Sequence, residues 1–171
     1  MLLSSLQFST PRLTAVAFAS ADITEGFATD IAQLLTPSVK AHLPPDVYCV
    51  VDTESAKNWL THTLSDALLV PFYLSESDTL AGFFLLYVMD DTQQKVDVRL
   101  GYVVAETFQG KGLASEIIEG LVAWCRASDR VASLAGGAEQ ANAASIRVLE
   151  KNGFTRDTDS EGDTVFLSLT F

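Results

Sequence analysis

The stretch from Leu100 to Arg126 reads LGYVVAETFQGKGLASEIIEGLVAWCR, and its hydrophobic period changes in the middle. The first residues, Leu100 to Val104, alternate and lead into the β-branched pair Val103-Val104, which is typical of a buried strand. From Leu113 onward, apolar residues recur at the spacing of an amphipathic helix. The apolar stripe of this helix comprises Leu113, Ala114, Ile117, Ile118, Leu121, Val122 and Cys125. The stretch therefore predicts a strand, a turn and a helix.

The turn between strand and helix is Gln109-Gly110-Lys111-Gly112. Glycines let backbone amides come close to a ligand, because they carry no side chain. The free N–H groups of the first helical turn, together with the positive end of the helix dipole, favour an anion there. The turn therefore predicts a phosphate site formed by the amides of residues 110–114.

Two known phosphate motifs fit this turn poorly. A nucleoside-triphosphate loop needs G-x-x-x-x-G-K-[ST], but Ala105 lies five residues before Gly110, and Gly112 follows Lys111. We exclude that motif. A dinucleotide fingerprint starting at Gly110 would have Ser115 in place of its third glycine, and no acidic residue ends the next apolar run. A dinucleotide oxidoreductase is therefore a weak alternative.

A third pattern, Q/R-x-x-G-x-G/A, is met by Gln109, Gly112 and Ala114, and here the turn resembles the acyl-coenzyme-A loop of the GNAT N-acetyltransferase superfamily. A second stretch from Asn142 to Phe154, NAASIRVLEKNGF, resembles the following helix in the branch that acetylates ribosomal-protein N-termini. Thr10 to Thr14, TPRLT, resembles the opening strand of that branch. Independently of the family, Asn142 is a good N-cap and Gly153 a good helix stop.

The resemblance implies an α+β domain with the GNAT-like acyl-CoA N-acyltransferase fold, whose mixed, mostly antiparallel central sheet is flanked by helices. The length of 171 residues favours a single domain, 1–171. Periodicity and turn residues predict strands at Leu13 to Ala19, Leu68 to Leu74, Thr79 to Met89, Val96 to Val104, Val131 to Ala135, Phe154 to Thr158 and Thr164 to Phe171. A break is expected at Gly136-Gly137 and a turn at 159–163.

Three further segments lie before the central strands. One helix or two short helices are expected from an N-cap at Asp22 to a stop at Pro37, and a further helix from a cap at Asp52 or Thr53 to Ser65. The segment 41–51 between them is a loop without further assignment. In the family that the chain resembles, these early helices and their loop form the wall of the acceptor site.

The resemblance implies acetyl-CoA as cosubstrate and assigns most of its contacts. The pyrophosphate would bind the loop, and the pantetheine arm would pair with the strand backbone. The first turn of the helix after Asn142 would face the cofactor sulfur, although an N-cap with its first turn is also an ordinary structural feature. The cofactor-binding residues are then Tyr102, Val103, Val104, Gln109, Gly110, Lys111, Gly112, Leu113, Ala114, Asn142 and Ser145.

The catalytic positions depart from the common family pattern. Leu149 stands where many members have a proton-donating tyrosine, so Ser145 is the expected catalytic donor to the leaving thiolate. Arg99 stands where many members have a glutamate base. Asp97 is the nearest substitute and Glu106 a remoter one, but an exposed carboxylate is the default interpretation of each.

The remaining polar residues and the composition limit the partners. His42 and His62 have no recognisable partner, and no cluster has metal-ligand spacing. The net charge of −11 argues against nucleic acid or an anionic membrane as the main partner. No signal peptide or membrane span is indicated, and Cys49 and Cys125 are expected to be reduced core thiols of a cytoplasmic protein. A homodimer is compatible with the sequence.

These observations predict an acetyl-CoA-dependent N-acetyltransferase that moves the acetyl group directly to a primary amine, with a protein N-terminal or small-molecule α-amine favoured. An α-amine titrates near ~7.7 to 8.0, whereas a lysine at ~10.4 needs a capable base that the chain does not obviously own. The main alternative is a non-catalytic acyl-CoA-binding regulatory module, because Arg99 and Leu149 replace both usual catalytic side chains.

Overall fold

The computed structural model describes residues 3–158 and 162–171, and its centre is a single eight-stranded sheet. The strand order is β1-β2-β3-β4-β5-β6-β8-β7, and every neighbouring pair is antiparallel except β5 and β6. The strands are β1 (Gln7–Ser9), β2 (Leu13–Val16), β3 (Leu68–Leu74), β4 (Leu80–Val88), β5 (Val96–Val104), β6 (Val131–Glu139), β7 (Thr155–Arg156) and β8 (Thr164–Thr170). The expected mixed, mostly antiparallel α+β fold is therefore confirmed.

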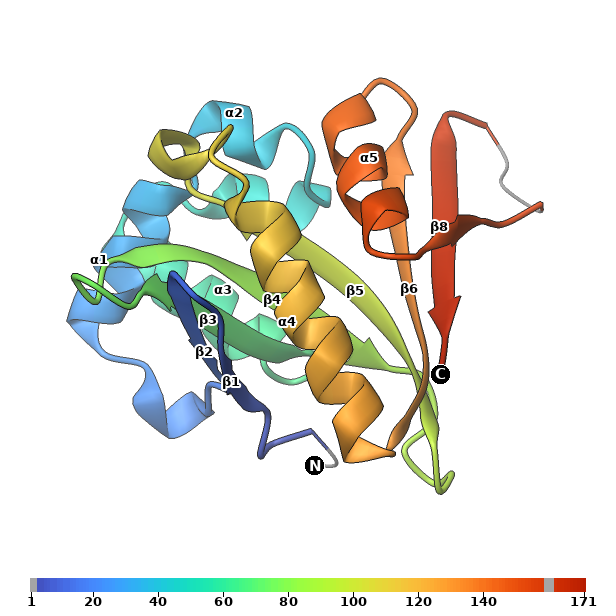
Figure 1. Cartoon of the computed structure of the whole chain (residues 1–171). Coiled ribbons are helices and arrows are strands. Elements are labelled where there is room, and N and C mark those ends of the chain that lie inside the picture. The colour runs from blue at the N-terminus through green and yellow to red at the C-terminus, as the bar shows by residue number, and fades with distance from the viewer. Residues whose placement is uncertain (1–2, 159–161) are drawn as a thin grey trace.

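Helices cover both faces of this sheet, as Figure 1 shows. On one face lie α4 (Leu113–Ser128) and α5 (Ala143–Lys151), and on the other α1 (Glu25–Leu34), α2 (Pro37–Lys40) and α3 (Thr53–Thr63). Three short 3₁₀ turns, η1 (Ser20–Asp22), η2 (Pro45–Cys49) and η3 (Glu106–Phe108), connect these elements.

Each face of the sheet packs into its own hydrophobic cluster. The α4-side core joins α4 and α5 to the sheet through residues such as Ile117, Ile118, Leu121, Ile146 and Leu149. The α1-side core joins α1, α2 and α3 to the sheet through residues such as Ile31, Val39, Trp59, Leu60 and Phe83. Successive side chains of a strand point to opposite faces, so β5 sends Val104 into the first core and Val103 into the second.

Several predicted elements are confirmed at or near their expected bounds. The strand at Val96 to Val104 and the helix start at Leu113 have the expected residues. Asp52 caps α3 by accepting from the backbone N–H of Ser55 at 2.8 Å. Asn142 caps α5 by accepting from the N–H of Ser145, and Gly153 follows that helix with φ +93°.

Other predictions about the early segment are wrong. Asp22 does not cap a helix but closes η1 by accepting from the N–H of Ala19, and Thr24 caps α1 instead. Helix α1 does end before Pro37, at Leu34, but Pro37 itself begins α2, because the missing N–H of proline costs nothing in a first turn. The expected strand at Leu13 to Ala19 ends at Val16.

Two more differences concern β6 and the cysteines. The sheet has no break at Gly136-Gly137, since β8 pairs with β6 as far as Glu139 and holds it extended. Cys49 is exposed, and its thiol donates to the carbonyl of Asp46, so it is not a core thiol. Cys125 is buried as expected. Of the predicted turn at 159–163, residues 159–161 lie outside the described residues.

Candidate functional site

The loop before α4 presents free backbone amides to solvent. Gly110 and Gly112 have φ values of +74° and +79°, a conformation that side chains other than glycine disfavour. Gly112 is the N-cap of α4, and no side chain caps the helix. The first intrahelical bond runs from Glu116 N–H to the Gly112 carbonyl at 3.1 Å, so the N–H groups of residues 113–115 have no partner within the helix. This arrangement suits an anion such as a pyrophosphate.

Two side chains of the loop pack against the protein itself. Gln109 Nε2 donates to the Val104 carbonyl at 3.0 Å and so ties the loop to the end of β5. Lys111 Nζ lies 5.6 Å from the centroid of the Phe108 ring, within the range of a cation–π contact. Gln109 therefore shapes the loop with its side chain, and the free amides of the loop belong to the residues after it.

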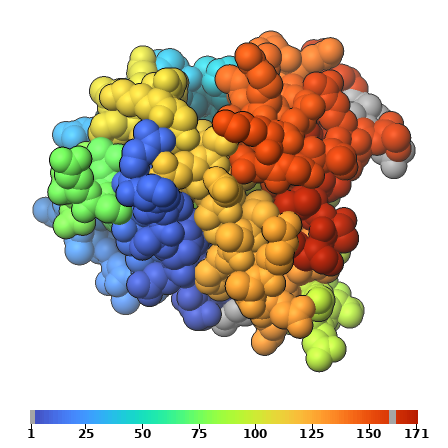
Figure 2. Space-filling model, in the orientation of Figure 1, coloured from blue at the N-terminus to red at the C-terminus, as the bar shows by residue number. Residues whose placement is uncertain are grey.

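Arg12 reaches the loop from the start of β2. Its Nε donates to Glu116 Oε1 at 2.8 Å, and its Nη1 donates to the Lys111 carbonyl at 3.0 Å. The hydroxyl of Thr10 donates to Glu116 Oε2 at 2.6 Å. Figure 2 shows the N-terminal strands and the loop side by side on one surface of the molecule. We call Thr10, Arg12 and Glu116 the clamp.

Against the effect of burial, Thr10 and Arg12 of the clamp lower the pKa of the Glu116 carboxylate, which lies in the first turn of α4. Burial by itself raises the pKa of Glu116, but hydrogen bonds from Thr10 and Arg12 outweigh it and lower the pKa overall. Glu116 is therefore ionised at neutral pH, and Arg12 balances its charge beside the loop. The sequence alone does not predict this contact, although Thr10 to Thr14 resembles the opening strand of the family branch.

Strands β5 and β6 separate next to the loop. Their parallel pairing ends at Leu100 with Gly136, whereas β4 pairs with β5 as far as Val104. Tyr102, Val103 and Val104 therefore have one strand edge without a strand partner. We call the space between this edge and the end of β6 the slot; Figure 1 shows the two strands diverging there. A strand edge of this kind can bind an extended chain through its backbone groups.

The N-terminal turn of α5 lies beside the slot. Asn142 Oδ1 accepts from Ser145 N–H at 3.3 Å, and Ser145 Oγ lies 2.9 Å from the hydroxyl of Tyr102. Burial raises the pKa of Tyr102, and the hydrogen bond with Ser145 counteracts this in part. Leu149 is 2% exposed and packs close to Gly136. The slot thus brings the hydroxyls of Tyr102 and Ser145 together. The sequence predicts a role for the backbone of Tyr102 but none for its hydroxyl.

The candidate bases lie elsewhere. Arg99 is exposed on β5, between Tyr87 of β4 and Ala135 of β6. Asp97 accepts from Ser133 Oγ at 2.6 Å, in the paired part of β5. Glu106 accepts from Thr36 at 2.8 Å and lines a cleft of about 700 Å³ whose lining includes no residue of the loop or slot named above.

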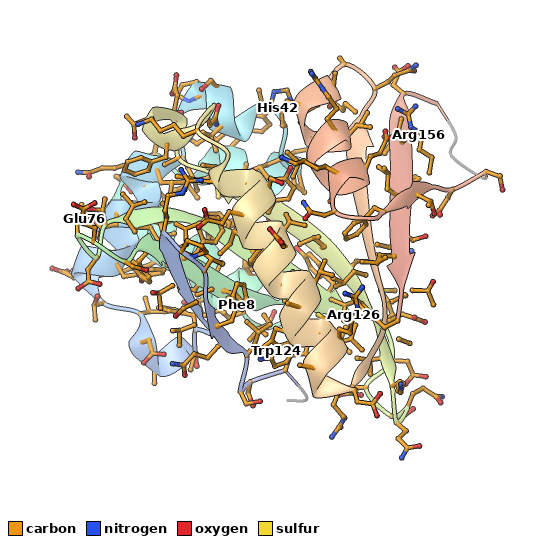
Figure 3. All side chains as sticks on the ribbon, in the orientation of Figure 1. Phe8, His42, Glu76, Trp124, Arg126 and Arg156 are labelled. Carbon is orange, nitrogen blue, oxygen red and sulfur yellow. The ribbon has the colours of Figure 1, made fainter. Side chains whose placement is uncertain are left out.

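The histidines and possible metal ligands add no further chemistry to this region. His42 and His62 are both exposed, and Figure 3 places His42 at the end of the molecule where α2 and α5 lie. Within residues 3–158 and 162–171, no group of three acidic, histidine or cysteine side chains could hold a metal ion. None of the helices described is long and apolar enough to cross a membrane.

Comparisons with solved structures identify the same fold at low sequence identity. A ribosomal-protein-S5-alanine acetyltransferase from Vibrio fischeri superposes with a TM-score of 0.75, at 15% identity over 96% of each chain. A ribosomal L7/L12 α-N-protein acetyltransferase in complex with coenzyme A gives 0.75, at 16% identity over 96% of this chain and 98% of that one. The microcin C7 self-immunity acetyltransferase, in complex with acetyl-CoA and AMP, gives 0.75 at 15% identity, over 94% and 93%.

The sequence itself matches one family model. No curated protein sequence matches the chain. The model for the acetyltransferase (GNAT) domain, however, matches residues 12–155, which include the clamp arginine, the loop, the slot strand β5 and the whole of α5. This match replaces the oxidoreductase alternative and confirms the resemblance that the loop and the α5 motif suggested: the chain belongs to the GNAT acetyltransferase family.

Proposed function

We propose that the chain transfers an acetyl group from acetyl-CoA directly to a primary α-amine, on a protein N-terminus or a small molecule. The single observation that carries this proposal is the slot, whose unpaired strand edge lies near the uncapped N-terminal turn of α4 and beside the N-terminal turn of α5. The pyrophosphate would bind the amides of residues 110–114. The backbone of Tyr102 to Val104 would hold the pantetheine arm and could polarise the thioester carbonyl.

The reaction needs no covalent enzyme intermediate. The amine nitrogen attacks the carbonyl carbon, the carbon–sulfur bond breaks, and the sulfur leaves with the electron pair and takes up a proton. Ser145 is the proposed donor, since its hydroxyl lies at the open end of α5, where the helix dipole stabilises negative charge. The attacking amine loses its extra proton to solvent.

The absence of a carboxylate in the described part of the slot favours an amine that is already partly neutral. Asp97 and Glu106 bond to other side chains, and a cation occupies position 99. An α-amine with a pKa of about 7.7 to 8.0 is partly neutral at pH 7.5, whereas a lysine amine of about 10.4 is almost wholly protonated. The same departures support a second candidate, a regulatory module that binds acyl-CoA without transferring it.

One assay separates the two candidates. Radiolabelled acetyl-CoA is incubated with peptides and amino acids that carry a free α-amine, and with N-blocked peptides that carry only lysine. We expect faster acetylation of α-amines, and none by the Gly112→Asp variant, whose carboxylate would stand where the anion must bind. Equal or faster acetylation of lysine would contradict the α-amine preference. Binding of acetyl-CoA without any transfer would favour the regulatory module.

A further inference from the structure

Tyr102 connects the two sides of the slot. It lies two residues beyond the last β5–β6 pair, and its ring packs on the α4-side core. Its hydroxyl lies 2.9 Å from Ser145 Oγ on α5, within the distance of a good O–H···O hydrogen bond. The two residues are far apart in sequence, so only the fold brings their hydroxyls together.

Two groups next to the hydroxyl pair, the Leu149 side chain and the backbone N–H of Ser145, cannot supply a proton to the sulfur. Leu149 fills the α5 position one turn later with an apolar side chain that is 2% exposed. The N–H of Ser145 already donates to Asn142 Oδ1, so only its hydroxyl remains for the slot. An aliphatic hydroxyl is a much weaker acid than a thiol of pKa ~8.5, whereas a phenol near ~10 is better matched to a departing thiolate. Ser145 acting alone would therefore be a poor acid.

The surroundings of Tyr102 keep its phenol protonated. Burial raises the pKa of Tyr102 above its usual value of 10, so the hydroxyl retains its proton across the neutral range. Among the described residues, the one hydrogen-bond partner of this hydroxyl is Ser145 Oγ. The phenolic proton therefore has a direct path to the serine oxygen.

We propose that Tyr102 is the positioning residue that supplies Ser145 with the proton for the leaving sulfur. This inference rests on the proposed function, in which the sulfur leaves beside the N-terminus of α5. As the carbon–sulfur bond breaks, the sulfur takes the proton of Ser145 Oγ, and the serine oxygen takes the proton of the Tyr102 hydroxyl. The phenolate regains a proton from water, and the new amide nitrogen releases one to water. The overall products are the acetylated amine and the free thiol.

The test compares Tyr102→Phe, Ser145→Ala and the double variant in the full chain. Tyr87→Phe is the matched control, since Tyr87 is a partly buried phenol of the neighbouring strand β4 that packs on the opposite core. Single-turnover transfer to an α-amine is measured from about pH 6 to 10.5, together with the Kd of acetyl-CoA and the melting temperature. These readouts separate proton supply from a purely structural contact.

We expect Tyr102→Phe to slow the transfer step by about 10- to 100-fold, with the Kd of acetyl-CoA unchanged within about threefold. The double variant should be no slower than Ser145→Ala, because both changes interrupt one path. Because the pKa of Tyr102 is raised, the wild-type rate should begin to fall only at the upper end of this pH range, and Tyr102→Phe should lack this descending limb. Tyr87→Phe should keep both the rate and the limb.

Three results would overturn the proposal alone: a Tyr102→Phe rate equal to wild type, a loss confined to melting temperature or Kd, or fully additive effects in the double variant. Each would reduce the contact with Ser145 to a link between β5 and α5. A wild-type chain that binds acetyl-CoA and acetylates no amine would instead remove the proposed function, and this inference with it.

Discussion

The two faces of the sheet are built in different ways. On the α4 side, two regular helices follow directly from a strand or a turn, and each begins at the residue that the sequence predicts. On the α1 side, the chain from Ser20 to Thr63 forms three helices and two 3₁₀ turns. Here the helix α1 and the start of α3 agree with prediction, whereas the N-cap of α1, the helix α2 and both 3₁₀ turns do not. The proposed cofactor loop lies on the first face, and the expected acceptor wall on the second.

The difference follows from what each face must do in the proposed function. A pyrophosphate needs several backbone amides in one fixed arrangement, and only a narrow set of residues provides it, such as glycine at φ +79° in position 112. A wall against an acceptor needs only a surface of the right shape, which many short elements can provide. We therefore expect changes on the α1 side to leave the loop undisturbed.

Because the two cores are separate, a large loss of stability on the α1 side should leave acetyl-CoA binding intact. Trp59 is 5% exposed in the α1-side core, 5.9 Å from the Phe83 ring between centroids. Trp59→Ala should lower the free energy of unfolding by about 3–5 kcal/mol, because it leaves a large cavity. The Kd of acetyl-CoA for the folded variant should stay within about threefold of wild type.

Trp59→Phe is the milder control. It keeps a ring in the core but removes the hydrogen bond from Trp59 Nε1 to Asp46 Oδ2 at 3.2 Å, which contributes about 1 kcal/mol. Urea unfolding and fluorescence titration measure both quantities. A tenfold or greater loss of acetyl-CoA affinity in folded Trp59→Ala would mean that the two faces are coupled through the sheet.

The converse experiment acts on the clamp. Arg12→Leu removes the cation that balances Glu116 and the donor to the Lys111 carbonyl, so a carboxylate remains beside the anion site. The affinity for acetyl-CoA should fall about tenfold, or about 1.4 kcal/mol. Stability should change by less than about 1 kcal/mol, because the Arg12 side chain is 49% exposed and such pairs contribute little.

A second substitution separates charge from shape at the clamp. In the Arg12→Leu background, Glu116→Gln removes the unbalanced charge and should recover part of the lost affinity. Isothermal titration of the wild type, both single variants and the double variant gives the coupling. If Arg12→Leu binds acetyl-CoA as tightly as wild type, the clamp serves only to attach the first strands to α4.

The clamp also shows where sequence reasoning stops. The helix at Leu113 and the caps at Asp52 and Asn142 were predictable, because local spacing and a single side chain decide them. The contact of Arg12 with Glu116 joins residues 104 positions apart, and no local pattern encodes such a pairing. The same holds for Tyr102 and Ser145, 43 positions apart.

Errors on the α1 side have a different origin. Proline in the first turn of α2 carries the same local signal as proline after a helix, so position 37 could be interpreted either way. Thr24 and Asp22 are both acceptable N-caps by residue type. In the structure Asp22 lies in η1, and Thr24 caps α1. Here packing chose among locally equivalent solutions, which is why the acceptor wall was the least predictable part of the chain.

The reactivity of the two cysteine thiols allows the two faces to be compared in the wild-type protein. Cys125 lies on the buried stripe of α4, and burial raises the pKa of its thiol to about 12. At pH 8 only about one such thiol in ten thousand is then ionised, and the thiolate is the reactive form. Cys49 on η2 is exposed. Native protein should therefore release one equivalent of thionitrobenzoate rapidly from Ellman's reagent, and denatured protein two.

Cys49→Ser should abolish the rapid phase, and saturating acetyl-CoA should leave the slow reaction of Cys125 slow. The expected difference is one of rate alone, with no change in fold or activity, which makes it the smallest of these effects. The rate of each thiol is specific to its position in the fold. If Cys125 reacts as fast as Cys49 in the native protein, α4 must open readily. A cofactor loop that depends on the first turn of that helix could not then hold its amides in one arrangement, and the contrast between a fixed cofactor face and a variable acceptor face would be wrong.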